Sequence, residues 1–331
     1  MKRAIVVTLL IGFLMSVGLT GYGYFKYTRM TGEWFEPLHS IQSDQWRQDE
    51  EPSPPNEQKK KEQRPRLDPF TIMILGVDTR GEKKARSDTI ILAAVNPTSQ
   101  QVKLLSIPRD TLVKIPGYGQ DKFNHAMFYG GAPLVKQTIE DFLGIKVDRY
   151  ATIDFEGFIK LVDSLDGVKV DVKRRMKYRD PSDGTEIDLH PGLQQLDGKQ
   201  ALDYARFRKS EIGSDASDFD RMDRQQEVMK QLADKATRFT TLFRVFKLMD
   251  ILEEHVKTDL TSDEIGRLAI LFKGFSSSEI ETMELGGTSR RMPKHGYNLW
   301  FHVVSDEEKK RIQHLIQKTL EDDKLPETAG P

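Results

Sequence analysis

The feature that most constrains this chain is an apolar, uncharged stretch at its N-terminus. Residues 4–25 (AIVVTLLIGFLMSVGLTGYGYF) contain no charged side chain and follow Lys2 and Arg3. A helix of that length crosses a hydrocarbon core of about 30 Å. The stretch lacks the pattern of small residues at which a signal peptide is cleaved. We therefore expect a retained transmembrane signal-anchor helix rather than a buried core helix.

The charges that flank this helix bear on its orientation. Lys2 and Arg3 on one side compete with Lys26 and Arg29 on the other. The size of the part that follows, and the lack of a second apolar stretch, favour an N-terminus inside the cell. We expect a single-pass, type II protein of the cell membrane, with residues 1–3 as a cytoplasmic tip and the folded domain extracytoplasmic.

A segment that is too polar to form a core follows the anchor. Residues 47–69 hold 12 charged residues and 5 prolines but only one large aliphatic side chain. That apolar surface is too small to offset the entropy lost on folding. We expect an extracytoplasmic linker over residues 26–67, one folded domain over 68–322 and a disordered tail over 323–331.

The domain alternates strand-like and helix-like segments. Strands are expected at 70–77, 89–95 and 102–107, and the last two flank an Asn-Pro turn, so they form a hairpin. The alternation predicts an α/β fold with a mixed central β-sheet flanked by helices. Further strands are expected at 149–154 and 168–172, and helices at 132–143, 155–165, 195–208, about 221–236, 243–257, 262–273 and 305–320.

Composition excludes several kinds of chemistry. The 331 residues include no cysteine, which removes disulfides, thiolate metal sites, cysteine nucleophiles and a lipoprotein anchor on cysteine. The chain has 50 Lys+Arg and 51 Asp+Glu residues, for a net charge of −1, which argues against a nucleic-acid partner. Any anion-binding site must therefore come from a local cluster of basic side chains.

Charged side chains stand at the ends of the first three expected strands. Side chains there point into the crevice at the edge of a sheet. Because the second and third strands form a hairpin, Asp88 and Arg109 should be neighbours. If the first strand runs parallel to the third, Asp78 joins the same edge. The charged residues at these ends are Asp78, Arg80, Arg86, Asp88, Arg109 and Asp110.

A second group of arginines flanks an acidic loop between two expected helices. Guanidinium groups match phosphate oxygens bidentately, so the group is typical of a phosphate clamp. An ordinary surface network of salt bridges is the alternative. Arginines and carboxylates together at the end of an apolar sheet favour a magnesium-bound phosphate ester. The residues of this second group are Arg206, Arg208, Asp218, Arg221, Arg224 and Gln225.

Seven segments of the chain carry recognisable motifs in a fixed order. They are ILGVDTR (74–80), ARSDTIILAAVNP (85–97), LLSIPRDT (104–111), KFNHAMFYGG (122–131), the stretch with FEGF and VDSLDGVKVDV (155–172), LDGKQALDYARFR (196–208) and DFDRMDRQQ (218–226). In order and spacing they resemble the LytR-CpsA-Psr family of cell-wall phosphotransferases. The resemblance runs from the membrane segment to about residue 236.

The resemblance implies a substrate and an acceptor. Members of that family transfer an anionic glycopolymer, such as wall teichoic acid, teichuronic acid or capsule, from an undecaprenyl pyrophosphate carrier. The acceptor is N-acetylmuramic acid of peptidoglycan, and the product is a phosphodiester. The prenyl tail requires an apolar tunnel, for which the Phe, Leu and Ile residues of 139–165 are candidates. Other wall-assembly proteins are further expected partners.

The resemblance also implies roles for the charged residues. Asp78 and Asp88 fall on the family's aspartates that hold Mg²⁺, with Mn²⁺ as an alternative. Asp218 matches the aspartate before the last arginine helix, and Asp220 stands where a small residue is expected. We also place Arg80 and Arg224 with the substrate-binding group. The residues that match pyrophosphate-contacting positions are Arg86, Arg109, Arg206, Arg208, Arg221 and Gln225.

Phosphoryl transfer mainly requires positioning and neutralisation of charge. Our hypothesis assigns Arg109 to the charge on the transferring phosphorus, and Asp218 or Asp110 to the proton of the acceptor hydroxyl. Two alternatives use the same residues. A lipid pyrophosphate hydrolase would use water as the acceptor, and an envelope protein that only binds or senses precursors would not turn them over.

Overall fold

The computed structural model describes most of the domain. Its described residues are 36–38, 67–78, 86–181, 184–208, 210, 217–236, 254–272, 275–294 and 296–321. Among them, no helix is long and apolar enough to cross a membrane. The expected anchor at 4–25, Arg80 and the expected tail at 323–331 lie outside the described residues, so the predictions that concern them stay predictions.

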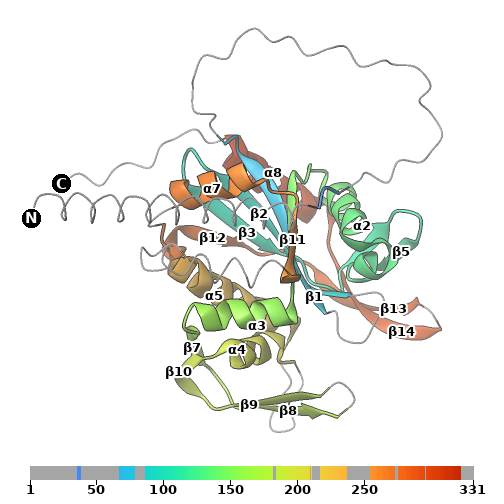
Figure 1. Ribbon diagram of the computed structural model, residues 1–331. Helices are drawn as coiled ribbons and strands as arrows, with labels where there is room; N and C mark the ends of the chain where they lie inside the picture. The colour runs from blue at the N-terminus through green and yellow to red at the C-terminus, as the bar shows by residue number, and fades with distance from the viewer. Residues whose placement is uncertain are drawn as a thin grey trace, which may run out of the picture.

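A mixed sheet of six strands forms the centre of the domain (Figure 1). The strand order is β11-β6-β1-β2-β3-β12. β2 pairs antiparallel with both β1 and β3, so β1 runs parallel to β3, and the expected hairpin is confirmed. The strands are β1 (Phe70–Asp78), β2 (Arg86–Asn96), β3 (Gln101–Ser106), β6 (Arg149–Asp154), β11 (Val256–Thr258) and β12 (Ile280–Met283).

Helices cover both faces of this sheet. Helices α2 (His125–Leu143) and α8 (Asp306–Glu321) pack on one face and bury Leu75, Leu92 and the other side chains that point that way. Helix α5 (Asp218–Ala236) contributes Met229 and Ala233 to the opposite face, against Ile72 and Ile74. Helix α7 (Ser262–Leu271) and a short 3₁₀ helix, η2 (Ser277–Glu279), lie in the C-terminal part. The predicted α/β fold class is therefore confirmed.

Below the sheet, as drawn in Figure 1, α5 also belongs to a second core. Two short antiparallel sheets close this region, one of β7 and β10 and one of β8 and β9. Its other elements are α3 (Phe155–Ser164), β7 (Val168–Val172), β8 (Met176–Asp180), β9 (Thr185–Leu189), β10 (Gly192–Leu196) and α4 (Gly198–Arg206).

Two more hairpins lie beside the sheet. β4 (Leu112–Ile115) pairs with β5 (Gly119–Lys122), and β13 (Thr288–Lys294) pairs with β14 (Tyr297–Val303). An isolated bridge joins Thr111 to His302 and so links the base of the second hairpin to the segment after β3.

Three expected helices differ from the structure. The helix expected from 195 begins at Gly198, because Asp197 and Gln200 form a capping box and the residues before them end β10. Of the helix expected over 243–257, residues 243–253 lie outside the described residues, and its end at Val256 and Lys257 belongs instead to β11, a three-residue edge strand too short to show a period. Helix α2 begins at His125 rather than 132 and is interrupted at Gly130 and Gly131.

Three residues of the expected linker lie against the domain. The backbone N of Glu36 donates to the carbonyl of Thr258 at 2.9 Å, and the Tyr150 hydroxyl donates to the carbonyl of Glu36 at 2.7 Å. Leu38 packs against the core that α2 and α8 form with the sheet. This part of the chain is therefore in contact with β6 and with the edge strand β11.

Candidate active site

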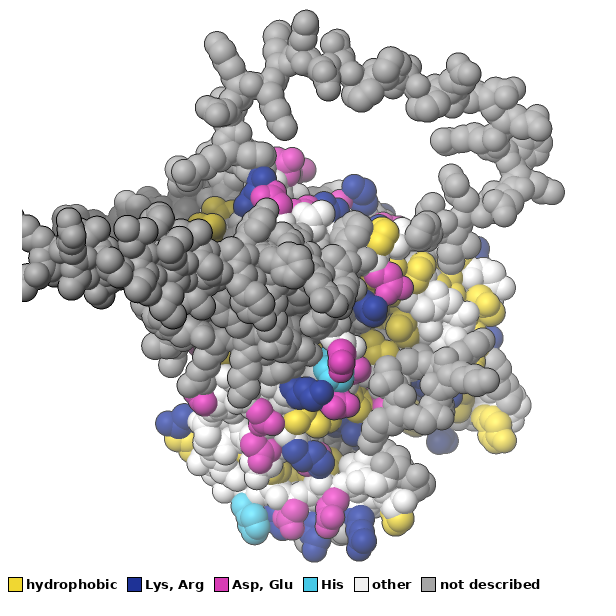
Figure 2. Space-filling model, viewed as in Figure 1, with side chains coloured by type: hydrophobic (Ala, Val, Ile, Leu, Met, Phe, Trp, Pro, Cys, Tyr) yellow, Lys and Arg dark blue, Asp and Glu magenta, His cyan; other side chains and the backbone are white. Residues whose placement is uncertain are grey.

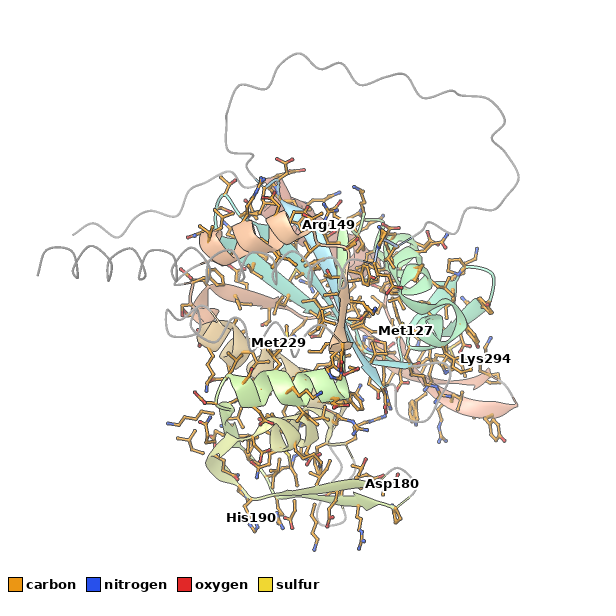
Figure 3. All side chains as sticks on the ribbon, viewed as in Figure 1. Met127, Arg149, Asp180, His190, Met229 and Lys294 are labelled. Carbon is orange, nitrogen blue, oxygen red and sulfur yellow. The ribbon has the colours of Figure 1, made fainter. Side chains whose placement is uncertain are left out.

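A cavity of about 190 Å³ lies between the central sheet and helices α3, α4 and α5. Most of its wall is apolar, and Met229, labelled in Figure 3, extends from α5 toward the sheet. The apolar lining residues are Ile74, Ile91, Ile153, Phe155, Phe158, Leu202, Val228 and Met229. The charged and amide side chains of the lining are Asp88, Asp154, Arg109, Arg206, Arg208, Arg221 and Gln225. Five of the sequence-predicted basic or amide residues therefore meet at one cavity.

A β-bulge brings Asp88 into this cavity. Gly76 pairs with Thr89 and Val77 pairs with Ser87, so Asp88 is the extra residue of β2. In a regular strand Asp88 and Thr89 would point to opposite faces of the sheet. A bulge re-aims one side chain, and both residues line the cavity. The bulge is what allows a carboxylate to stand beside the first apolar residues of β2.

Asp88 forms an ion pair with Arg109. The Arg109 Nη1 donates to Asp88 Oδ1 at 2.5 Å, and the two side chains are 22% and 27% exposed. The prediction from the hairpin that Asp88 and Arg109 are neighbours is therefore confirmed.

Asp78 lies at the same edge of the sheet. Along β1, Met73, Leu75 and Val77 are buried in the α2/α8 core, so Asp78 shares the opposite face with Ile74. The Asp78 Oδ2 is 4.0 Å from Arg206 Nη2. The condition of the prediction, a first strand parallel to the third, is met, and Asp78 and Asp88 each lie beside an arginine, Arg206 and Arg109.

The arginines come from the ends of two helices. Arg206 is the last residue of α4, and its guanidinium lies over the Phe155 ring, 4.4 Å from the centroid. Arg221 and Gln225 are 3% and 8% exposed and lie one turn apart on α5. A buried guanidinium is costly unless hydrogen-bond acceptors or an anion surround it.

Arg224 points elsewhere. Its Nε donates to the carbonyl of Tyr204 at 2.8 Å, and its Nη2 donates to the carbonyl of Phe207. The last carbonyls of a helix lack hydrogen-bond donors within the helix, and Arg224 provides such donors at the end of α4. Burial lowers the pKa of Arg224, but a guanidinium keeps its charge. Arg224 therefore does not line the cavity. It holds the end of α4 in place, and this end of the helix carries Arg206 and Arg208.

Two other predicted residues stand outside the lining. Asp110 Oδ1 accepts a hydrogen bond from Lys122 Nζ at 2.8 Å, which turns it toward β5. Arg86 pairs across the strands with Asp78, and its guanidinium lies 5.7 Å from the Phe128 centroid. The structure thus brings Arg86 to the edge of the sheet but not into the cavity.

Asp220, which stands where the resemblance leads us to expect a small residue, has structural partners. Ser217 Oγ accepts from the Asp220 N–H at 3.0 Å, and Asp220 Oδ2 accepts from the Ser217 N–H at 2.8 Å, which makes a capping box for α5. The same carboxylate accepts from Arg174 at 3.0 Å. The hydrogen bonds from Ser217 lower the pKa of Asp220. The extra charge is therefore engaged at the start of the helix.

Sequence reasoning missed one lining carboxylate, Asp154. It ends β6, which runs parallel to β1, and its Oδ1 accepts from the Gly157 N–H at 2.8 Å as the N-cap of α3. His255 Nδ1 is 3.0 Å from the same carboxylate. The signal was present, because an aspartate ends an apolar strand there and precedes a helix. The Phe, Leu and Ile residues of 139–165 were candidates for the wall of an apolar tunnel. Three of them, Ile153, Phe155 and Phe158, line this cavity.

No group of three or more His, Asp or Glu side chains suited to a metal ion occurs among the described residues. Asp78 and Asp88 stand at the same end of the paired strands β1 and β2, and carboxylate oxygens are ligands that Mg²⁺ takes, together with phosphate oxygens and water. Asp218 is the first residue of α5.

Comparison with known proteins gives concordant matches. The sequence profile of the LytR_cpsA_psr family matches residues 39–318. The polyisoprenyl-teichoic acid–peptidoglycan teichoic acid transferase TagU of Halalkalibacterium halodurans is 33% identical over 327 residues, which cover 97% of this chain and 99% of that protein. TagU of Bacillus subtilis is 32% identical over 323 residues, which cover 97% of each chain.

Solved structures agree with these matches. B. subtilis TagV superposes with a TM-score of 0.66 at 30% identity, over 76% of this chain and 97% of that one. A structure of TagT bound to LIIa-WTA superposes with a TM-score of 0.61 at 30% identity, over 76% and 91% of the two chains. The fold, the residues of the cavity and these matches together show that the chain belongs to the LytR-CpsA-Psr family.

Proposed function

We propose that this protein transfers an anionic glycopolymer from a polyprenyl-pyrophosphate-linked precursor to peptidoglycan, leaving a phosphodiester. Relatives at 32% and 33% identity over nearly their whole length are named as teichoic acid transferases of this kind. The observation that carries the proposal is the cavity itself, which joins an apolar interior to a mouth with four arginines, Arg109, Arg206, Arg208 and Arg221.

That combination suits a lipid pyrophosphate. An apolar chain gains free energy when it leaves water for the Ile, Phe and Met side chains of the interior. The pyrophosphate then reaches guanidinium groups that have already lost part of their hydration, where each charge interaction is stronger than in water. A sheet edge and two helix ends hold these groups in place before the substrate arrives.

Arg109 is the residue that we assign to the reacting phosphorus. It is held against Asp88 at 2.5 Å, so its orientation is set before binding. As the bond to the lipid phosphate breaks, charge accumulates on the bridging and equatorial oxygens, and a fixed guanidinium stabilises that charge at little reorganisation cost. Arg206, Arg208 and Arg221 bind the pyrophosphate in this scheme.

The proton of the acceptor hydroxyl requires a base. Of the two aspartates considered, Asp110 is paired with Lys122 and points away from the cavity lining. This pairing favours Asp218, which begins α5 three residues before Arg221.

We propose that Asp78 and Asp88 hold a Mg²⁺ ion, or Mn²⁺ in its place, when the substrate is bound. Such an ion supplies Lewis-acid neutralisation of the pyrophosphate charge. We further propose that the protein is a single-pass membrane protein with this domain outside the cell, as the apolar stretch at 4–25 predicts.

The test is an assay with the full-length protein in detergent. It contains a lipid-pyrophosphate-linked glycan, Mg²⁺ and peptidoglycan oligomers, and the products are separated by mass. We expect glycan joined to the oligomers and free lipid phosphate. Glycan released without joining would show a hydrolase, and bound but unchanged precursor would show a binding or sensing protein.

A further inference from the structure

Hairpin β13–β14 projects from the body of the domain, at the right in Figure 1, and Lys294 lies near its tip in Figure 3. Its strands pair from Thr288 with Val303 to Lys294 with Tyr297. Trp300 is 54% exposed and Tyr297 is 72% exposed. A two-stranded ribbon is marginally stable alone, and large aromatic side chains kept in water are typical of a binding surface.

One face of the ribbon combines an aromatic ring with polar groups. Arg291 is paired with Trp300 and Pro293 with Asn298, and alternate pairs share a face. The Arg291 guanidinium lies over the indole of Trp300, 5.2 Å from its centroid. This stacking orients the indole and places a cation beside it.

His302 links this face to the mouth of the cavity. It lies roughly 7 Å along β14 from Trp300, on the same face. Its backbone N donates to the carbonyl of Asp110 at 3.0 Å, and its ring meets Phe219 edge-on at 5.6 Å. Phe219 is 47% exposed and lies two residues before Arg221 of the cavity. A series of aromatic side chains, exposed at Trp300 and Phe219 and buried at His302, therefore leads from the ribbon toward the proposed reaction centre.

The ribbon has one sign of charge. Residues 288–303 include Arg290, Arg291 and Lys294 and no acidic residue. The face around α3, α4 and the β8–β9 hairpin differs, because basic and acidic side chains alternate over it in Figure 2. A partner of the β13–β14 ribbon is therefore expected to carry negative charge.

We propose that the face formed by Arg291, Asn298 and Trp300 docks the acceptor strand, an extended chain of N-acetylated amino sugars with carboxylate-bearing peptides. The indole stacks on the apolar face of a sugar ring, the amide bonds to sugar hydroxyls, and the guanidinium meets a peptide carboxylate. An anionic membrane surface would favour a continuous apolar patch, whereas Trp300 is bordered by Arg291 and Asn298. This assignment rests on the proposed function, for which it names where the acceptor lies.

The test titrates the full-length protein with soluble, uncrosslinked peptidoglycan strands that carry a fluorescent label. Trp300→Ala should weaken strand binding about tenfold, and Trp300→Phe should restore most of it. Tyr297→Ala is the matched control, because Tyr297 is more exposed but lies on the other face of the ribbon. It should change binding by less than about twofold. In the transfer assay, Trp300→Ala should raise the KM for the strand and leave the KM for the lipid donor unchanged.

Equal binding by Trp300→Ala and the wild type would overturn the docking proposal, as would equal losses in Trp300→Ala and Tyr297→Ala. So would binding of the wild type to phosphatidylglycerol vesicles but not to strands. Arg109→Ala should bind strands as the wild type does. If strands bind through Trp300 but no glycan is ever joined to them, the docking site stands and the transferase function fails.

Discussion

The two faces of the central sheet come from the same strands and serve different purposes. On the α2/α8 face, Leu75, Leu92 and Ile139 are fully buried in a continuous apolar core. On the α5 face, the sheet meets a cavity, and α5 buries Arg221 and Arg224 where α2 buries aliphatic residues. Buried arginines stabilise a fold less than apolar residues of similar volume. The comparison indicates that one face supplies stability and the other supplies the chemistry.

The largest effect should come from Arg109→Ala. We expect the rate of glycan transfer to fall about 10² to 10³-fold, the usual cost of losing one fixed donor to a developing charge. Arg149→Ala is the matched control, because Arg149 also forms an ion pair, with Glu264, but begins β6 at the opposite edge of the sheet (Figure 3). A fall of less than tenfold in Arg109→Ala, or an equal fall in both variants, would refute the assigned site.

A second prediction compares the shortening of one apolar side chain on each face of the central sheet. Ile139→Ala in α2 should lower the free energy of unfolding by about 2–5 kcal/mol, because it opens a void in a packed core. Ile153→Ala should cost about half as much or less, since Ile153 already borders the cavity. Urea unfolding of the two variants measures both values. Equal losses would show that the cavity face contributes as much stability as the core.

A third prediction separates two arginines one turn apart on α5. Arg224→Ala should lower the free energy of unfolding by about 1–3 kcal/mol, because the end carbonyls of α4 lose their donor. Arg221→Ala should cost less stability but weaken binding of the lipid donor. Thermal unfolding and donor titration of both variants check this. The distinction fails if Arg221→Ala is the less stable protein.

The smallest effect concerns Asp220 and pH. Its folded-state pKa is lowered, so its stabilising contribution is present above the ordinary pKa of 3.8 and is lost as the pH falls through the folded value. Asp220→Asn should therefore lose a few tenths of a kcal/mol at neutral pH. Its unfolding free energy should converge with that of the wild type as the pH falls through the lowered folded-state pKa of Asp220. A constant difference across that range would assign the loss to another cause.

Much of the sheet edge was predictable from sequence. Alternating apolar strands and an Asn-Pro turn placed Asp88 beside Arg109, and the structure confirms the pair. The β-bulge that turns Asp88 into the cavity was not predictable. A bulge shifts the pairing of two strands by one residue, and nothing in the sequence of β1 or β2 marks where that shift occurs. The sequence also could not predict which of Arg221 and Arg224 lines the cavity. Both lie one helical turn apart, and only the packing of α4 decides which one reaches the cavity.

The short strands β11 and β12 were not predicted, and their length explains why. β11 has three residues and β12 has four, so neither shows a period of two, and each forms only because a longer strand offers its edge. No helix or strand was predicted over 288–303, yet this segment forms the ribbon that carries Trp300.

The most direct test of the central claim is a crystal structure of the protein with a bound polyprenyl pyrophosphate. The account predicts the prenyl chain between Ile74, Phe158 and Met229, with the phosphates against Arg206 and Arg221. A lipid bound elsewhere, or a cavity that stays closed to it, would contradict the claim that this face of the sheet binds the donor.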